Sequence, residues 1–400
     1  MCADGPLDAE QLPGLLSGLV DASVLQRSDT PRGDRYSMLD TIREYGQAWL
    51  RGLGEEQVLR ERHRGYFRSL ARRAAENWMG RDQLAWSERC TTEHANLRLA
   101  LDACLIDPDP RPALEMAGNL WLFWNCGGFG REGFRYLDRA LAANPDPGDT
   151  PERFWALWAC AVLAVNRGDL DALIDLDGTC TPLADRLGDP AAIAIARIVR
   201  VWRLTLPGDH QSALEILSDA ARWPDQGAGL QMARLLALSS VSFTHLLLGQ
   251  FDQATATAGP LLQECERLGD QWIRGFARYF LAMAALGKGE HATAIRHARG
   301  AIAIKWRLHD VFGAAMAVDT LAPATALTEP EQAARLLGIS DTLWHIIGEA
   351  QFGVAELIAA RQACERQIRD ALGDGAFQDA HKAGLDMRLD EGIEYALHPQ

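Results

Sequence analysis

The chain has 400 residues, of which 48% are hydrophobic and 24% are charged, and this balance excludes a mainly disordered protein. Its formal net charge of −14 argues against binding nucleic acid through phosphate contacts, because such surfaces cluster Lys and Arg. No uncharged apolar run reaches the roughly 18 residues of a membrane helix, and the N-terminus lacks the order of a signal peptide. The sequence therefore predicts a cytoplasmic protein that binds neither a membrane nor nucleic acid directly.

The first stretch, 1–50, predicts the last portion of a winged-helix module. Apolar residues recur at helical spacing from Leu12 to Val20. Two β-prone runs flank a turn-rich segment, which predicts a hairpin over 23–39. A helix should follow from about Thr41 to Leu50. Helix, hairpin and helix come in the order found at the end of a winged-helix module, so we expect a truncated remnant of one.

Residues 51–111 predict a helical connector that lacks the periodicity of the later sequence. Apolar stripes such as Leu97 and Leu101 mark its helices. The segment Asp107–Pro110 should end the last of them, because proline lacks an amide donor and restrains the residue before it. The proline-rich segment Asn144–Asp149 predicts a second break farther along.

A glycine turn then recurs at an almost fixed spacing of 40 or 41 residues, at Gly128, Gly168, Gly208, Gly249 and Gly289. Such a period is typical of a solenoid, in which each unit buries its apolar face on its neighbours. We predict an all-α solenoid of tetratricopeptide-like helix pairs over 112–345 and a C-terminal helical cap over 346–400. A standard tetratricopeptide unit has about 34 residues, so a HEAT-like unit fits the length better. The small residues that follow the turns favour the tetratricopeptide type.

The sequence offers no recognisable catalytic or metal-binding pattern. Eight cysteines are scattered without a C-x-x-C pair, so we expect buried free thiols in a reducing compartment. His291 and His297 are six residues apart and would face different sides of a helix. We therefore predict a protein that is not an enzyme and uses no cofactor or metal. An enzyme of unfamiliar type is the alternative, and it would need a deep pocket with convergent buried acids.

Three stretches carry a family resemblance: Met38–Tyr45, Arg62–Phe67 and Glu93–Leu101. In this order they resemble the segment after the nucleotide-binding domain of actinobacterial STAND-type transcriptional regulators. The resemblance implies a large switch with an NB-ARC-like ATPase, a winged helix, a tetratricopeptide sensor and often a LuxR-type DNA-binding domain. The chain lacks the phosphate-loop pattern G-x-x-x-x-G-K-[ST], and no basic helix-turn-helix follows its repeats. We expect the sensor portion of such a regulator, without its own ATPase and DNA-binding domains.

Aligning the turn glycines with the tetratricopeptide pattern places eight residues on the inner face of the solenoid: Asn125, Trp158, Asn166, Trp202, Ser239, Phe243, Tyr279 and Met283. This groove should receive a small-molecule effector or a protein partner as the signal of a transcriptional switch. A stand-alone interaction scaffold is the alternative, and self-association stays open. Trp202, Phe243 and Met283 should form an apolar row, because they are equivalent in successive units. If the alignment is shifted by one residue, the row is instead buried between helices.

Overall fold

The computed structural model describes residues 8, 10–30, 33–109, 111–143, 148–223 and 227–398. This part of the chain is nearly all helical, with a single two-stranded sheet, so the predicted all-α helical-repeat fold is confirmed. Residues 31 and 32 of the predicted hairpin turn lie outside the described residues. So do Pro110 and 144–147 of the two predicted breaks.

The N-terminal elements follow the predicted order of helix, hairpin and helix. They are α1 (Leu12–Asp21), β1 (Gln26–Thr30), β2 (Gly33–Ser37) and α2 (Asp40–Leu53). The two strands pair antiparallel, with Gln26 opposite Ser37. Neither α1 nor α2 contains a buried residue, and Tyr45 and Trp49 of α2 are 72% and 66% exposed. The two helices of this unit therefore bury little surface against the rest of the molecule. Its interpretation as a winged-helix remnant stays a prediction.

A further group of helices leads into the repeats: α3 (Glu56–Glu76), α4 (Gln83–Thr92), α5 (His94–Leu105), α6 (Arg111–Asn119), α7 (Trp121–Cys126) and α8 (Gly130–Ala142). The stripe Phe67 and Leu70 on α3 packs in one core with Leu97 and Leu101 on α5. All four side chains are 3% exposed or less. These helices form because their apolar residues recur on one face.

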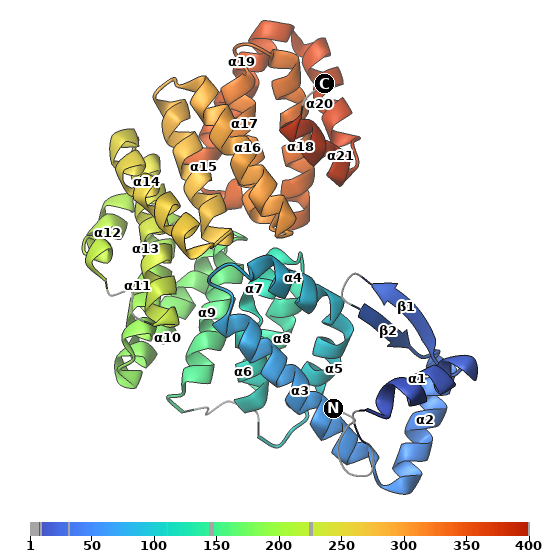
Figure 1. The fold of residues 1–400 in the computed structure, drawn as a ribbon. Helices are drawn as coiled ribbons and strands as arrows, with labels where there is room; N and C mark the ends of the chain where they lie inside the picture. Colours follow the sequence, from blue (N-terminus) through green and yellow to red (C-terminus); the bar gives the residue numbers. More distant parts are fainter. Residues whose placement is uncertain are drawn as a thin grey trace.

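Five helix pairs follow: α9 (Pro151–Val165) with α10 (Leu170–Leu187), α11 (Pro190–Thr205) with α12 (His210–Ile216) and the short η1 (Ala220–Arg222), α13 (Ala228–Leu247) with α14 (Phe251–Leu268), α15 (Trp272–Gly287) with α16 (His291–Arg307), and α17 (Val311–Thr325) with α18 (Pro330–Ile347). The five repeated turn glycines all have positive φ, from 63° to 96°. Glycine adopts this backbone conformation without the steric cost that a Cβ imposes. Figure 1 shows the pairs as a curved row from α9 to α18.

One contact across the curved row centres on Gln83. Gln83, at the start of α4, donates to Asp270 at 2.5 Å and accepts from the backbone of Trp272 at 2.9 Å. The Trp121 ring of α7 lies 5.6 Å from the Trp272 ring, edge to face. Gln83 and Asp270 are both 0% exposed. The helices before the repeats are thus joined to the turn between α14 and α15.

The C-terminal residues fold back onto the last repeat. They form η2 (Ala350–Gly353), α19 (Ala355–Leu372), α20 (Asp374–Leu385) and α21 (Leu389–Leu397). The carboxylate of Asp319 on α17 accepts from Trp344, Gln351 and Arg361 at 2.6–2.7 Å. This network fixes η2 and α19 against the last helix pair.

Candidate ligand-binding cavity

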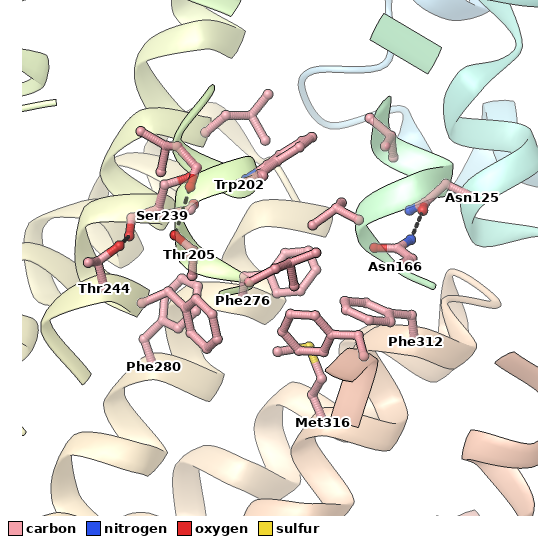
Figure 2. A pocket seen from close by; sticks show the side chains of 18 of the residues that line it. Asn125, Asn166, Trp202, Thr205, Ser239, Thr244, Phe276, Phe280, Phe312 and Met316 are labelled. Carbon is pink, nitrogen blue, oxygen red and sulfur yellow. Dashed lines mark hydrogen bonds between the residues drawn. The ribbon is translucent and has the colours of Figure 1, made fainter. Parts of the chain in front are cut away.

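A cavity of about 120 Å³ lies on the inner side of the curved row. It is lined by residues of α7, α9, α11, α13, α15, α17 and η2, and we call it the aromatic cavity. Seven of its lining side chains are aromatic: Trp202, Phe243, Trp272, Phe276, Phe280, Phe312 and Phe352. Figure 2 shows several of these rings pointing into the same space from different helices.

Five of the eight sequence-predicted residues line this cavity: Asn125, Asn166, Trp202, Ser239 and Phe243. Trp158 does not, because its side chain is 0% exposed and lies behind the wall. Its ring stacks on Trp202 at 5.2 Å and so supports a lining residue from within the core. A fully buried indole also contributes to stability through packing rather than through contact with a ligand.

Tyr279 and Met283 line a different pocket, of about 250 Å³, beside Asp319 and Arg361. The expected row of Trp202, Phe243 and Met283 is therefore broken, and Phe280 lies beside Phe243 in place of Met283, with ring centroids 6.1 Å apart. Helices that pack at an angle do not keep equivalent positions level along their axes. Met283 consequently lies almost one turn beyond the aromatic cavity.

Sequence reasoning missed most of the lining residues, among them Phe276, Phe280, Phe312, Met316 and Phe352. Four of these five carried a usable signal in the sequence. Phe276 and Phe280 on α15 are spaced i, i+4, as are Phe312 and Met316 on α17, and residues at this spacing share a helix face. Phe352 carried none, since it comes from η2, outside the repeats.

Phe352 is placed in the cavity wall by an unusual backbone. Gln351 and Phe352 have φ of 47° and 39°, a backbone conformation that residues other than glycine rarely adopt. The Phe352 ring is 4% exposed and contacts Phe243 and Phe312, at 5.9 and 5.2 Å. A Cβ at Gly168 would lie 2.5 Å from the Phe352 carbonyl oxygen. The glycine turn between α9 and α10 thus leaves the space in which η2 crosses the groove.

Polar groups occupy the two ends of the aromatic cavity (Figure 2). At one end the Asn166 amide donates to the Asn125 carbonyl oxygen. At the other, the hydroxyls of Thr205, Ser239 and Thr244 donate to carbonyl oxygens one turn earlier in their own helices, at 2.8–2.9 Å. These hydroxyl oxygens keep lone pairs that can accept from a ligand. Among the described residues that line this cavity, none is titratable, so its lining offers binding groups rather than an acid or base.

A second, larger cavity of about 370 Å³ adjoins the first. The two share Asn125, Asn166 and Phe312 as lining residues. The larger cavity is also lined by Arg131, Arg167 and His345, and we call it the basic vestibule.

A buried ion pair underlies one wall of the aromatic cavity. Lys305 Nζ lies 2.8 Å from Asp310 Oδ2, and the two side chains are 1% and 0% exposed. The same carboxylate accepts from Trp272 Nε1 at 2.9 Å. The Lys305 ammonium also lies 3.1 Å from the centroid of the Phe276 ring, a cation–π contact. Burial lowers the pKa of Lys305, while the Asp310 carboxylate opposes that shift. The cluster fixes two of the aromatic residues that face the cavity.

The seven cysteines in the described part of the chain are buried and free, as predicted. Burial raises the pKa of Cys160 and Cys180, each to about 12. Such thiols are poor nucleophiles, because the reactive thiolate is scarcely populated. Over the described residues, no helix combines the length and the apolar character needed to cross a membrane.

No protein-family model matches the chain. The chain is 28% identical over 269 residues to proteins named "Putative HTH-type transcriptional regulator" from Mycobacterium bovis and from Mycobacterium tuberculosis H37Rv. The match takes in 65% of this chain but only 28% of each of these relatives. The chain is thus distantly similar to part of much longer regulators.

Proposed function

We propose that the chain is the effector-sensing region of a transcriptional regulator and that the aromatic cavity holds the effector. The observation that carries this proposal is the cavity itself, which is walled by aromatic side chains from several repeats and has polar groups at both ends. Apolar walls with a few placed polar groups are typical of small-molecule sites. The distant similarity to regulators supports the choice of a sensor over a metabolic enzyme.

The course of η2 favours a small molecule over a protein segment. Its residue Phe352 contacts Phe243 and brings its carbonyl oxygen against the turn at Gly168, so η2 crosses the groove. A volume of about 120 Å³ accommodates a body of roughly one aromatic ring, since an engineered cavity of about 150 Å³ binds benzene. An extended peptide would need the open groove that this crossing segment occupies.

Effector occupancy would reach the rest of a regulator through the segment that carries Phe352. Helix α19 begins three residues after Phe352, at Ala355, and Gln351 donates to the Asp319 carboxylate that also accepts from Arg361 of α19. A ligand that moves the Phe352 ring therefore biases the packing of α19 against α17. In the STAND-type regulators that the N-terminal motifs resemble, nucleotide-binding and DNA-binding domains would respond to such a change. On this proposal the region described here is a tetratricopeptide-type sensor and catalyses no reaction itself.

A fragment screen tests the assignment of the cavity. Ligand-observed NMR with small aromatic and aliphatic fragments should yield hits that raise the melting temperature. Ser240→Phe should abolish their binding, because Ser240 is a half-buried lining residue and the larger ring fills the space. Gln253→Phe is the matched control, an exposed position on α14 outside the cavity. Hits that bind Ser240→Phe as well as the wild type, or a screen without hits, would refute the proposal.

A further inference from the structure

The aromatic cavity and the basic vestibule adjoin each other, and their linings are chemically different. Asn125, Asn166 and Phe312 line both. The aromatic cavity is apolar except at its ends. The basic vestibule is larger and is bordered by Arg131, Arg167 and His345. A ligand that fills both cavities must therefore carry two unlike parts.

The vestibule is basic in a chain that is strongly acidic overall. No Asp or Glu is among the described residues that line it, although the formal net charge of the chain is −14. Arg131 is exposed and makes no ion pair within the described part of the chain. Arg167 lies 3.6 Å from Asp169, and its guanidinium carbon lies 4.6 Å from the Phe134 ring centroid. The Asp169 carboxylate is shared, because its Oδ1 also caps α10 by accepting from Ala172.

From this juxtaposition we propose that the adjoining cavities bind a small amphipathic carboxylate. Its apolar body, about one ring or a branched alkyl group in size, enters the aromatic cavity, and its carboxylate reaches the guanidinium groups of Arg131 and Arg167. Arginine recognises carboxylates through paired, charge-assisted hydrogen bonds. The amides of Asn125 and Asn166 flank the short linker between the two parts. This inference rests on the proposed function, since it names the chemical class of the effector.

The test compares matched probes by isothermal titration calorimetry. 4-Phenylbutyrate carries both parts, 4-phenylbutanamide lacks the charge, and butyrate lacks the ring. The wild-type chain should bind 4-phenylbutyrate at least about 10-fold more tightly than the amide, because a charge-assisted hydrogen bond is stronger than a neutral one. Butyrate should bind at least about 10-fold more weakly than 4-phenylbutyrate, because it leaves the aromatic cavity empty.

Arginine variants locate the charge. In Arg131→Gln and in Arg167→Gln, affinity for 4-phenylbutyrate should fall about 5- to 10-fold while affinity for the amide stays within twofold. Arg135→Gln is the control, an exposed arginine on α8 outside the vestibule lining, and should change neither value. Circular dichroism checks that each variant remains folded.

Each unfavourable outcome has a separate meaning. Equal affinity for the acid and the amide would overturn the carboxylate assignment and leave the aromatic cavity as the effector site. A preference for the acid that survives both arginine substitutions would overturn the role of the vestibule. Failure of both phenyl probes to bind would overturn this ligand class. If neutral fragments still bind and Ser240→Phe blocks them, the proposed function stands without this ligand class. If no fragment binds either, both the ligand class and the proposed function are refuted.

Discussion

Replacing Lys305 with methionine is expected to lower the free energy of unfolding by about 3–5 kcal/mol, the cost of breaking a buried ion pair by removing one partner. The substitution leaves the Asp310 carboxylate, which is 0% exposed, without the cation 2.8 Å away. Trp272 and the Gly313 amide still donate to that carboxylate, but two neutral donors do not offset a buried charge. Methionine keeps a similar volume, so lost packing adds little.

A second variant separates the charge from the packing. Lys305→Met combined with Asp310→Asn removes both charges, and asparagine remains a good helix cap for α17 in place of the aspartate that accepts from Gly313. The double variant should recover most of the loss and lie within about 1–2 kcal/mol of the wild type, because replacing both members of a buried pair is often nearly neutral. Lys288→Met is the surface control, since its ammonium is 3.4 Å from a largely exposed Asp252, and it should cost less than about 1 kcal/mol.

Urea unfolding followed by circular dichroism measures the total effect, and hydrogen–deuterium exchange of the α15–α17 amides measures local opening. The single variant should increase exchange chiefly around Trp272 and Phe276, the rings that the ammonium contacts. The reasoning is wrong if Lys305→Met costs less than about 1 kcal/mol, or if the double variant is no more stable than the single one.

Three further substitutions probe the cavity and its supports. Phe243→Ala should cost about 2 kcal/mol, below the roughly 3–5 of a fully buried Phe, because the ring is half-buried, and it should weaken fragment binding; urea unfolding that gives 4 or more would place Phe243 in the core. Gly168→Ala should lower the melting temperature more than Gly128→Ala. Both positions have positive φ, but only at Gly168 would the new Cβ meet the Phe352 carbonyl, at 2.5 Å; equal shifts in a thermal melt would contradict the crossing of η2. Burial raises the pKa of Asp270 from 3.8 to about 6, so the stability contributed by its protonated form is full below pH 3.8 and lost as pH rises through 6. Stability of the wild type relative to Asp270→Asn should therefore fall by about 3 kcal/mol from well below pH 3.8 to well above pH 6, and a flat difference in urea titrations would count against it.

The sequence was most informative about the helices and turns, because these depend on local patterns. Gly168 and Gly249 were identified as turns by spacing, and both have positive φ between paired helices. The hairpin was predicted from β-prone runs around a turn, and its strands pair over Gln26–Thr30 and Gly33–Ser37. Periodicity locates elements well because it reflects which face each element buries.

The candidate site was only partly predictable, because a period does not fix the angle at which successive helices cross. The alignment found Trp202 and Phe243 but extended the row to Met283, where the structure has Phe280. The alignment also placed Trp158 on the face of the groove, whereas its ring packs in the core behind Trp202. Phe352 reaches the cavity from η2, outside the repeats. No local sequence pattern predicts a contact between η2 and repeat helices that are distant in the chain.

The link through Gln83 changes how this solenoid should respond to force and to heat. An open array of repeats can lose its terminal units one at a time, because each unit touches only its neighbours. Here the Gln83 amide joins Asp270 across 187 residues of chain, so the repeats between them behave as a loop with its ends tied together. A unit inside that loop cannot peel away without either breaking the tie or straining every other unit. Melting should therefore be concerted across α4 to α15, whereas the N-terminal hairpin unit lies outside the tied segment and can fray separately.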